Sequence, residues 1–426
     1  MRKVLNLTVL VAALGYFVDM FDLTIFGVVR MSSLKELGVE PSQLMSTGIM
    51  MVNLSAVGML IGGVMWGVLG DKKGRLSILF GSILLYSTAN VLNAFVTSIP
   101  QYAVLRFIAG VGLAGELGAA VTLVSEMLSK EDRGYGTTII AAVGMCGAVA
   151  ASMIGQLTHW KTAYLIGGGL GFLLLAARLK MVDSGMFAKV QQNERRGDLR
   201  LHFSEGRFTR YLYCILVGLP IYFTTGILFT FSPELSKGLG LEGITAGNAL
   251  LFGTIGLTFG DLLSGLLSQW MKSRKNAVYV SLAVGFVFSL AYFFAAGISN
   301  TMFYAICFVL GAAAGYWAVL VTIAAEQFGT NIRATVATSV PNFVRSSVIL
   351  LTLGFSSLKG TIGTVNAAMS VGVVVFAVAA FGMSRLRETY GRDLDYVETS
   401  GGEPLLESSS GRENSGMDEL RSAQAN

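Results

Sequence analysis

Residues 46–69 read STGIMMVNLSAVGMLIGGVMWGVL and contain no Asp, Glu, Lys or Arg. An α-helix of about 20 apolar residues spans the hydrocarbon core of a bilayer, and a helix satisfies its backbone hydrogen bonds internally, as lipid requires. Similar apolar segments recur along the chain at 5–29, 76–98, 102–128, 136–158, 162–182, 211–235, 247–271, 277–297, 301–325, 335–358 and 362–385. The sequence therefore predicts an all-α membrane protein with twelve transmembrane helices.

The composition agrees with this prediction. Only 13% of the 426 residues are charged and 53% are hydrophobic, whereas a soluble domain carries about 25% charged residues. The apolar segments also lack the polar stripe that a soluble amphipathic helix shows. The first segment is too long for a secretory signal and carries two aspartates, so we expect it to remain in the protein.

The placement of basic residues predicts the orientation. With a cytoplasmic N-terminus, 24 of the 31 Lys and Arg fall on cytoplasmic connections, five fall on the opposite side, and two, Arg106 and Arg345, fall inside helices. Because positive charge is retained on the cytoplasmic side, we expect both termini to be cytoplasmic. The predicted location is the inner (plasma) membrane.

Two halves of the chain resemble each other at an offset of about 200 residues. The Gly67–Arg75 loop has a counterpart at Gly265–Lys275, and Glu126 precedes Arg133 as Glu326 precedes Arg333. Transporters often consist of such repeats, with the substrate between them. We predict two pseudo-symmetric six-helix bundles, at residues 1–182 and 210–386. A cytoplasmic linker at residues 183–209 joins them, and a disordered cytoplasmic tail follows at residues 387–426.

Two motifs resemble those of the major facilitator superfamily. The loop signature G-x-L-x-D-R-x-G-R is matched by Gly67, Leu69, Asp71, Gly74 and Arg75, and the helix signature R-x-x-x-G-x-G by Arg106, Gly110 and Gly112. The resemblance implies alternating access, controlled by a cluster of gating residues. The gating candidates are Gly67, Asp71, Gly74, Arg75, Arg106, Glu126, Arg133, Glu326 and Arg333.

Within this superfamily, two segments resemble the metabolite–proton and aromatic-acid–proton symporter branches. They are Asp19-Met-Phe-Asp22 and Gly115-Glu116-Leu-Gly118. Met20 and Ala114 stand where those branches have glycine.

Ionisable side chains inside a bilayer are costly, and they are functional candidates for that reason. The candidates for proton coupling are Asp19, Asp22, Glu116 and Asp261. Asp19 and Asp22 share a helix face, and two carboxylates in a poorly hydrated site do not both ionise readily. Alternatively, one aspartate pairs with Arg106 or another basic group as a structural lock. Glu116 is either a second proton carrier or a partner of Arg106.

Arg345 shares a polar stripe with Asn342 and Thr338. A guanidinium there can bind a carboxylate through paired hydrogen bonds, and the alternative is a buried ion pair with Asp261. The predicted substrate-binding residues are Arg345, Asn342, Tyr222, Thr225 and Gln156. For the aromatic residues, simple packing is an equal alternative.

These patterns favour a proton-coupled symporter for a small organic anion such as a carboxylate. The sequence has no nucleophile–base pair, metal cluster or nucleotide-binding loop, so we expect no enzyme activity and no cofactor besides the coupling proton. The expected partners are the substrate and the lipid bilayer, without nucleic acid, and the expected state is a monomer. The alternatives are proton-driven efflux of a drug-like or lipid compound, or a non-transporting sensor.

Overall fold

The structure is a computed structural model that describes residues 7–73, 75–116, 133–183, 207–391, 396–397 and 405–406. Almost all of these residues are helical. Short turns and loops connect the helices, and the described residues also contain one antiparallel pair of two-residue strands, β1 (Tyr396–Val397) and β2 (Leu405–Leu406). The expected linker and tail lie largely outside the described residues.

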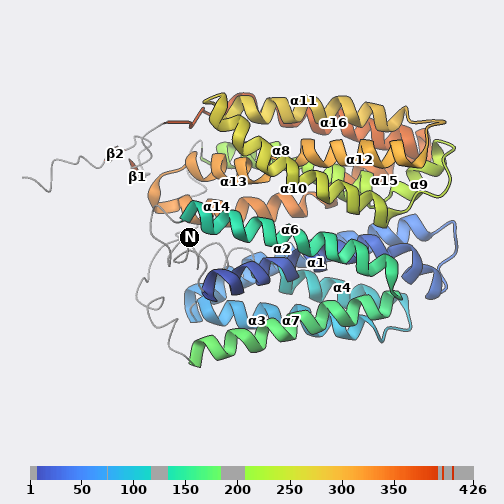
Figure 1. Ribbon diagram of the computed structural model, residues 1–426, viewed down its shortest axis with the longest axis horizontal. Helices are drawn as coiled ribbons and strands as arrows, with labels where there is room; N and C mark the ends of the chain where they lie inside the picture. The colour runs from blue at the N-terminus through green and yellow to red at the C-terminus, as the bar shows by residue number, and fades with distance from the viewer. Residues whose placement is uncertain are drawn as a thin grey trace, which may run out of the picture.

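The first half of the chain forms long helices that run along the long axis of the molecule (Figure 1). They are α1 (Leu7–Glu36), α2 (Leu44–Lys73), α3 (Arg75–Asn93), α4 (Ile99–Leu113), α6 (Arg133–Leu157) and α7 (Trp160–Asp183). In Figure 1, α3 and α7 lie on one side of the molecule, and α11 and α16 of the second half lie on the opposite side.

The second half has shorter pieces. They are α8 (Arg207–Phe223), the π-helix η3 (Thr224–Phe229), α9 (Ser232–Gly238), α10 (Ala246–Trp270), α11 (Arg274–Phe293), α12 (Asn300–Ala314), α13 (Trp317–Glu326), α14 (Thr330–Ser346), α15 (Val348–Ile362) and α16 (Thr364–Arg385). Each of the twelve predicted segments overlaps a described helix. However, the segments 211–235, 301–325 and 335–358, expected as single helices, are interrupted.

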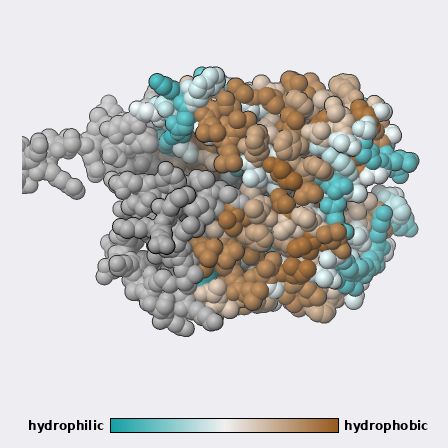
Figure 2. Space-filling view, viewed as in Figure 1, coloured by the Kyte–Doolittle hydropathy of each residue, from teal (hydrophilic) through white to brown (hydrophobic). Residues whose placement is uncertain are grey.

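Eight stretches of the described residues are long and apolar enough to cross a bilayer. On the face shown in Figure 2, hydrophobic residues cover the middle of the molecule, and hydrophilic residues gather at the end where Figure 1 places the connection between α1 and α2, residues 37–43. We call this the distal end. Large apolar side chains such as Leu173, Leu266 and Leu350 point outward and are mostly exposed, as expected for helices that face lipid.

Glycines give the two halves the same internal contact. A Cβ on Gly58 of α2 would overlap the carbonyl oxygen of Phe107 on α4, and a Cβ on Gly256 of α10 would overlap that of Phe308 on α12. Only glycine allows backbones to approach so closely. Both members of the second pair lie about 200 residues after those of the first, which supports the predicted duplication.

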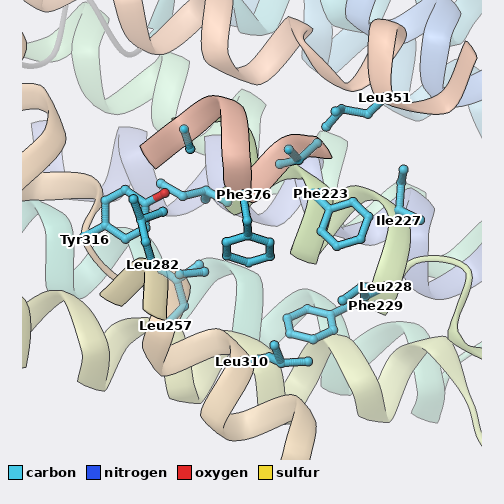
Figure 3. Close-up of a cluster of buried hydrophobic side chains, with 14 of the residues drawn as sticks. Phe223, Ile227, Leu228, Phe229, Leu257, Leu282, Leu310, Tyr316, Leu351 and Phe376 are labelled. Atoms are coloured by element: carbon cyan, nitrogen blue, oxygen red, sulfur yellow. The ribbon is translucent and has the colours of Figure 1, made fainter. Parts of the chain in front are cut away.

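The break between α12 and α13 is anchored by an aromatic cluster in the second half. Figure 3 shows Phe376 between Tyr316 and Phe223, and the rings of Phe223 and Phe376 meet edge to face at 6.4 Å. Tyr316 lies at the break, and its hydroxyl donates to the Val217 carbonyl oxygen of α8 at 2.8 Å. This contact fixes the start of α13 against α8.

Candidate functional site

A cavity of about 190 Å³ lies between the two halves. It is lined from the first half by α1, α2, α4 and α6, and from the second half by α8, η3, α10, α13, α14 and α15. Tyr16, Phe26, Tyr222 and Trp317 supply aromatic surface. A dry cavity of about 150 Å³ is known to accept benzene, so this cavity is large enough for one six-membered ring.

A buried ion pair joins the two halves at this cavity. Arg345 Nη2 on α14 donates to Asp19 Oδ2 on α1 at 3.2 Å, and both side chains are almost fully buried. Asp19 Oδ1 and the Nε and Nη1 atoms of Arg345 have no hydrogen-bond partner among the described residues. The alternative pairing of Arg345 with Asp261 is therefore wrong, because Asp19 of α1 reaches the guanidinium across the cavity instead.

Asp261 has a different environment. Its Oδ1 accepts a hydrogen bond from the backbone N–H of Ala318 at 3.2 Å, in the first turn of α13. A helix N-terminus favours an anion, so the break at Gly315 creates a partner for this carboxylate. A Cβ on Gly315 would contact the backbone of Asp261 at 2.5 Å, which explains why glycine stands there. A proton-coupling role for Asp261 remains a prediction.

Glu116 forms a two-pronged ion pair with Arg178 of α7, and both side chains are buried. The pairing of Glu116 with Arg106 is therefore wrong. Arg178 lies near the end of the apolar segment 162–182, where a basic residue is expected to face the cytoplasm. In the structure this guanidinium is only 4% exposed.

Asp22 and Arg106 are also buried, but no ion pair within 4.0 Å joins them, and neither Asp22 oxygen has a hydrogen-bond partner among the described residues. Among the described residues no aspartate pairs with Arg106, and the aspartate that pairs with another basic group is Asp19, with Arg345. Instead, Arg106 lines the cavity, donates to Ser55 Oγ at 3.1 Å and lies over the Phe26 ring.

Of the other predicted binding residues, Tyr222 and Thr225 line the cavity, and Tyr222 meets Trp317 edge to face at 6.2 Å. Gln156 and Asn342 do not line it. The Gln156 carboxamide donates to the Ser152 carbonyl of its own helix and lies close to Gly247 of α10.

Arg106 and Glu326 are the gating candidates whose side chains the structure describes. Gly74 and Glu126 lie outside the described residues, and the side chains at Gly67, Asp71, Arg75, Arg133 and Arg333 are not described. Glu326 forms an ion pair with Arg274 at 2.6 Å. Arg274 follows α10 as Arg75 follows α2, so this pair is the second-half version of the predicted cluster.

A second ion pair between the halves was not predicted from the sequence. Arg30 of α1 is fully buried and donates to both carboxylate oxygens of Glu234 on α9, at 2.6 and 2.8 Å. It also donates to the Thr230 carbonyl oxygen at 3.1 Å and lies over the Phe231 ring. We call this group the distal lock. No motif marks it, because Arg30 directly follows a predicted span and appeared to be a loop residue.

Comparisons with known proteins agree with this architecture. The family model described as Major Facilitator Superfamily matches residues 12–353. The chain is 27% identical to the niacin transporter NiaP of Acinetobacter baylyi over 76% of this chain and 80% of that protein. It is 22% identical to the benzoate transport protein of the same organism, over 77% of this chain and 78% of that protein.

It is also 27% identical to the 3-(3-hydroxy-phenyl)propionate transporter of Escherichia coli, over 76% of this chain and 81% of that protein. Among solved structures, a D-xylose-proton symporter superposes with a TM-score of 0.70 at 17% identity, covering 91% of this chain and 99% of that one. That likeness shows the fold of two six-helix halves. The chain therefore belongs to the Major Facilitator Superfamily and is a membrane transporter rather than an enzyme.

Proposed function

We propose that this transporter carries a small aromatic carboxylate together with a proton, by alternating access of the cavity to the two sides of the membrane. Relatives named for transport of niacin, benzoate and 3-(3-hydroxy-phenyl)propionate support this substrate class. The cavity supports it independently, because it has room for one ring, an aromatic lining and a buried guanidinium.

The observation that carries the proposal is the Asp19–Arg345 pair between the halves. While Asp19 is ionised, its carboxylate accepts a hydrogen bond from the Arg345 guanidinium and balances its charge. Protonation of Asp19 removes its charge and leaves the guanidinium free to bind a substrate carboxylate through paired hydrogen bonds. The proton and the anion thus favour each other's binding, which is the thermodynamic requirement for symport.

The same pair connects substrate binding to movement. Asp19 lies on α1 and Arg345 on α14, so replacing this contact changes an interaction that holds the two halves together at mid-depth. A ligand shifts a conformational equilibrium only through contacts that differ between the states. We further propose that the transporter is a multi-pass protein of the plasma membrane with both termini in the cytoplasm. It acts as a monomer and uses no cofactor besides the coupling proton.

Transport by purified protein in proteoliposomes tests this function. Labelled benzoate or nicotinate should accumulate against its gradient when a proton gradient is imposed. Asp19→Asn should abolish that accumulation but retain substrate exchange, and Arg345→Gln should abolish both. Glu36→Gln is the matched control, because Glu36 is an exposed carboxylate on the same helix. Normal proton-driven accumulation by the Asp19→Asn variant would refute the proposed coupling.

A further inference from the structure

We propose that Arg106 is a second anion-binding residue of the central cavity, and that it holds the substrate carboxylate while Arg345 is still paired with Asp19. This inference rests on the proposed function and divides anion binding into two steps. Arg106 lies on α4, is only 4% exposed and lines the same cavity as Arg345.

Charge compensation separates Arg106 from three other buried arginines. Arg30, Arg178 and Arg345 each pair with a carboxylate. Within the part of the chain that the structure describes, Arg106 has no carboxylate within 4.0 Å. A buried cation without a counter-ion is costly, so an anion that enters the cavity gains more from Arg106 than from an arginine that is already paired.

The neighbours of Arg106 orient its guanidinium without neutralising it. Nη2 donates to the Ser55 hydroxyl at 3.1 Å, the Tyr164 hydroxyl lies close by, and the Phe26 ring covers one face at 4.6 Å. Its Nε has no hydrogen-bond partner among the described residues. Asp22 acts on Arg106 only at longer range. The guanidinium is therefore held in place with donor capacity to spare.

The two arginines are far enough apart to act in sequence. Arg345 contacts Asp19, and Arg106 contacts Phe26, which lies two turns further along α1. Seven residues of helix correspond to about 10 Å, so one carboxylate occupies one guanidinium at a time. Arg106 accepts the anion first, and protonation of Asp19 then makes Arg345 available at the other end of the cavity.

A binding experiment with purified full-length protein at constant neutral pH tests this order. Benzoate affinity is measured by calorimetry for the wild type, Arg106→Gln, Asp19→Asn and the double variant. We expect Arg106→Gln to weaken benzoate binding about tenfold or more in the wild-type background. In the Asp19→Asn background Arg345 has no aspartate partner, so the same substitution should change the affinity little.

Two controls distinguish anion binding from a structural role. Benzamide is a neutral analogue of benzoate, and Arg106→Gln should leave its affinity unchanged. Arg106→Lys, which keeps the charge, should recover part of the benzoate affinity. Unchanged benzoate affinity in Arg106→Gln would overturn the proposal, and so would an equal loss for benzoate and benzamide or an equal loss in both Asp19 backgrounds.

A probe that does not depend on the substrate class separates this proposal from the proposed function. Nitrate is a planar monoanion like a carboxylate, and binding to the folded state raises the unfolding temperature. Nitrate should stabilise the wild type more than Arg106→Gln. If the wild type binds no aromatic carboxylate, the proposed substrate is wrong, and the nitrate comparison still decides the role of Arg106. Equal stabilisation of both proteins by nitrate would refute it.

Discussion

Glu234→Gln should open the distal end of the transporter. Glu234 accepts two hydrogen bonds from Arg30, which lies on the other half of the molecule. The substitution keeps the size of the side chain but removes its charge, so the guanidinium of Arg30 stays buried without a counter-ion whenever this end is closed. When the end opens, water can solvate Arg30, and the penalty disappears.

The magnitude follows from burial. Removing one partner of a buried ion pair costs about 3–5 kcal/mol. The Arg30 side chain is 0% exposed but that of Glu234 is 17% exposed, which favours the lower limit of about 3 kcal/mol. Since about 1.4 kcal/mol corresponds to a factor of ten, the ratio of closed to open molecules should fall about 100-fold.

Pulsed electron paramagnetic resonance can measure this change between spin labels at Glu40 and Glu242. Both residues are exposed and lie in connections at the distal end, one in each half. The labels are attached in a background without native cysteines. We expect a longer distance to become dominant in Glu234→Gln.

Glu36→Gln is the matched control for this measurement. Glu36 lies near the same end, but its partners His159, Trp160 and Lys161 belong to its own half. The loss of such an exposed pair costs no more than about 1 kcal/mol. If the two variants give the same distance distribution as the wild type, the distal lock does not hold the halves together.

Two further predictions concern stability, measured by thermal unfolding in detergent. Burial favours a higher pKa for Glu388, but hydrogen bonds from Ser273 and from backbone N–H groups, two of them at the start of α11, outweigh it and lower the pKa to about 2. Glu388→Gln should therefore destabilise the protein by about 1 kcal/mol at neutral pH, and the difference should shrink as the pH falls from 4.5 towards 2. Gly256→Val should destabilise the protein by about 1–3 kcal/mol, because the new Cβ overlaps the Phe308 carbonyl oxygen. Gly265→Val on the same helix, where nothing lies near the Cβ, should change the stability little. Equal losses of stability would contradict the close packing of α10 on α12.

The helical segments were predictable because lipid imposes both their length and their apolar composition. The interruptions were not. The break before α13 depends on a hydrogen bond from Ala318 to Asp261 on α10 and one from Tyr316 to α8. These contacts join residues about 60 and 100 positions apart, so no local pattern indicates them. Pro341 lies inside α14, yet the interruption between α14 and α15 comes later, at Ser347.

The candidate charges were predictable for a similar reason, but their partners were not. The cost of burial singles out Asp19 and Arg345 wherever they occur in an apolar segment. Which carboxylate meets Arg345 depends on how the halves pack, and the sequence alone pointed to Asp261 as the ion-pair partner. Arg30 and Arg178 were missed because a residue near the end of an apolar segment can turn inward or outward, and its partner decides which.

One face of α1 connects these observations. Asp19, Asp22, Phe26 and Arg30 follow at spacings of three, four and four residues, which keeps them on one side of a helix. Asp19 reaches Arg345 and Arg30 reaches Glu234, both on the other half, while Phe26 lies between them and lines the cavity. Protonation of Asp19 and release of Arg30 from Glu234 therefore act on the same helix, at two positions about 16 Å apart. Because both residues lie on one face of α1, a rotation of this helix moves Asp19 and Arg30 together. We therefore expect release of the pair at Asp19 to weaken the distal lock.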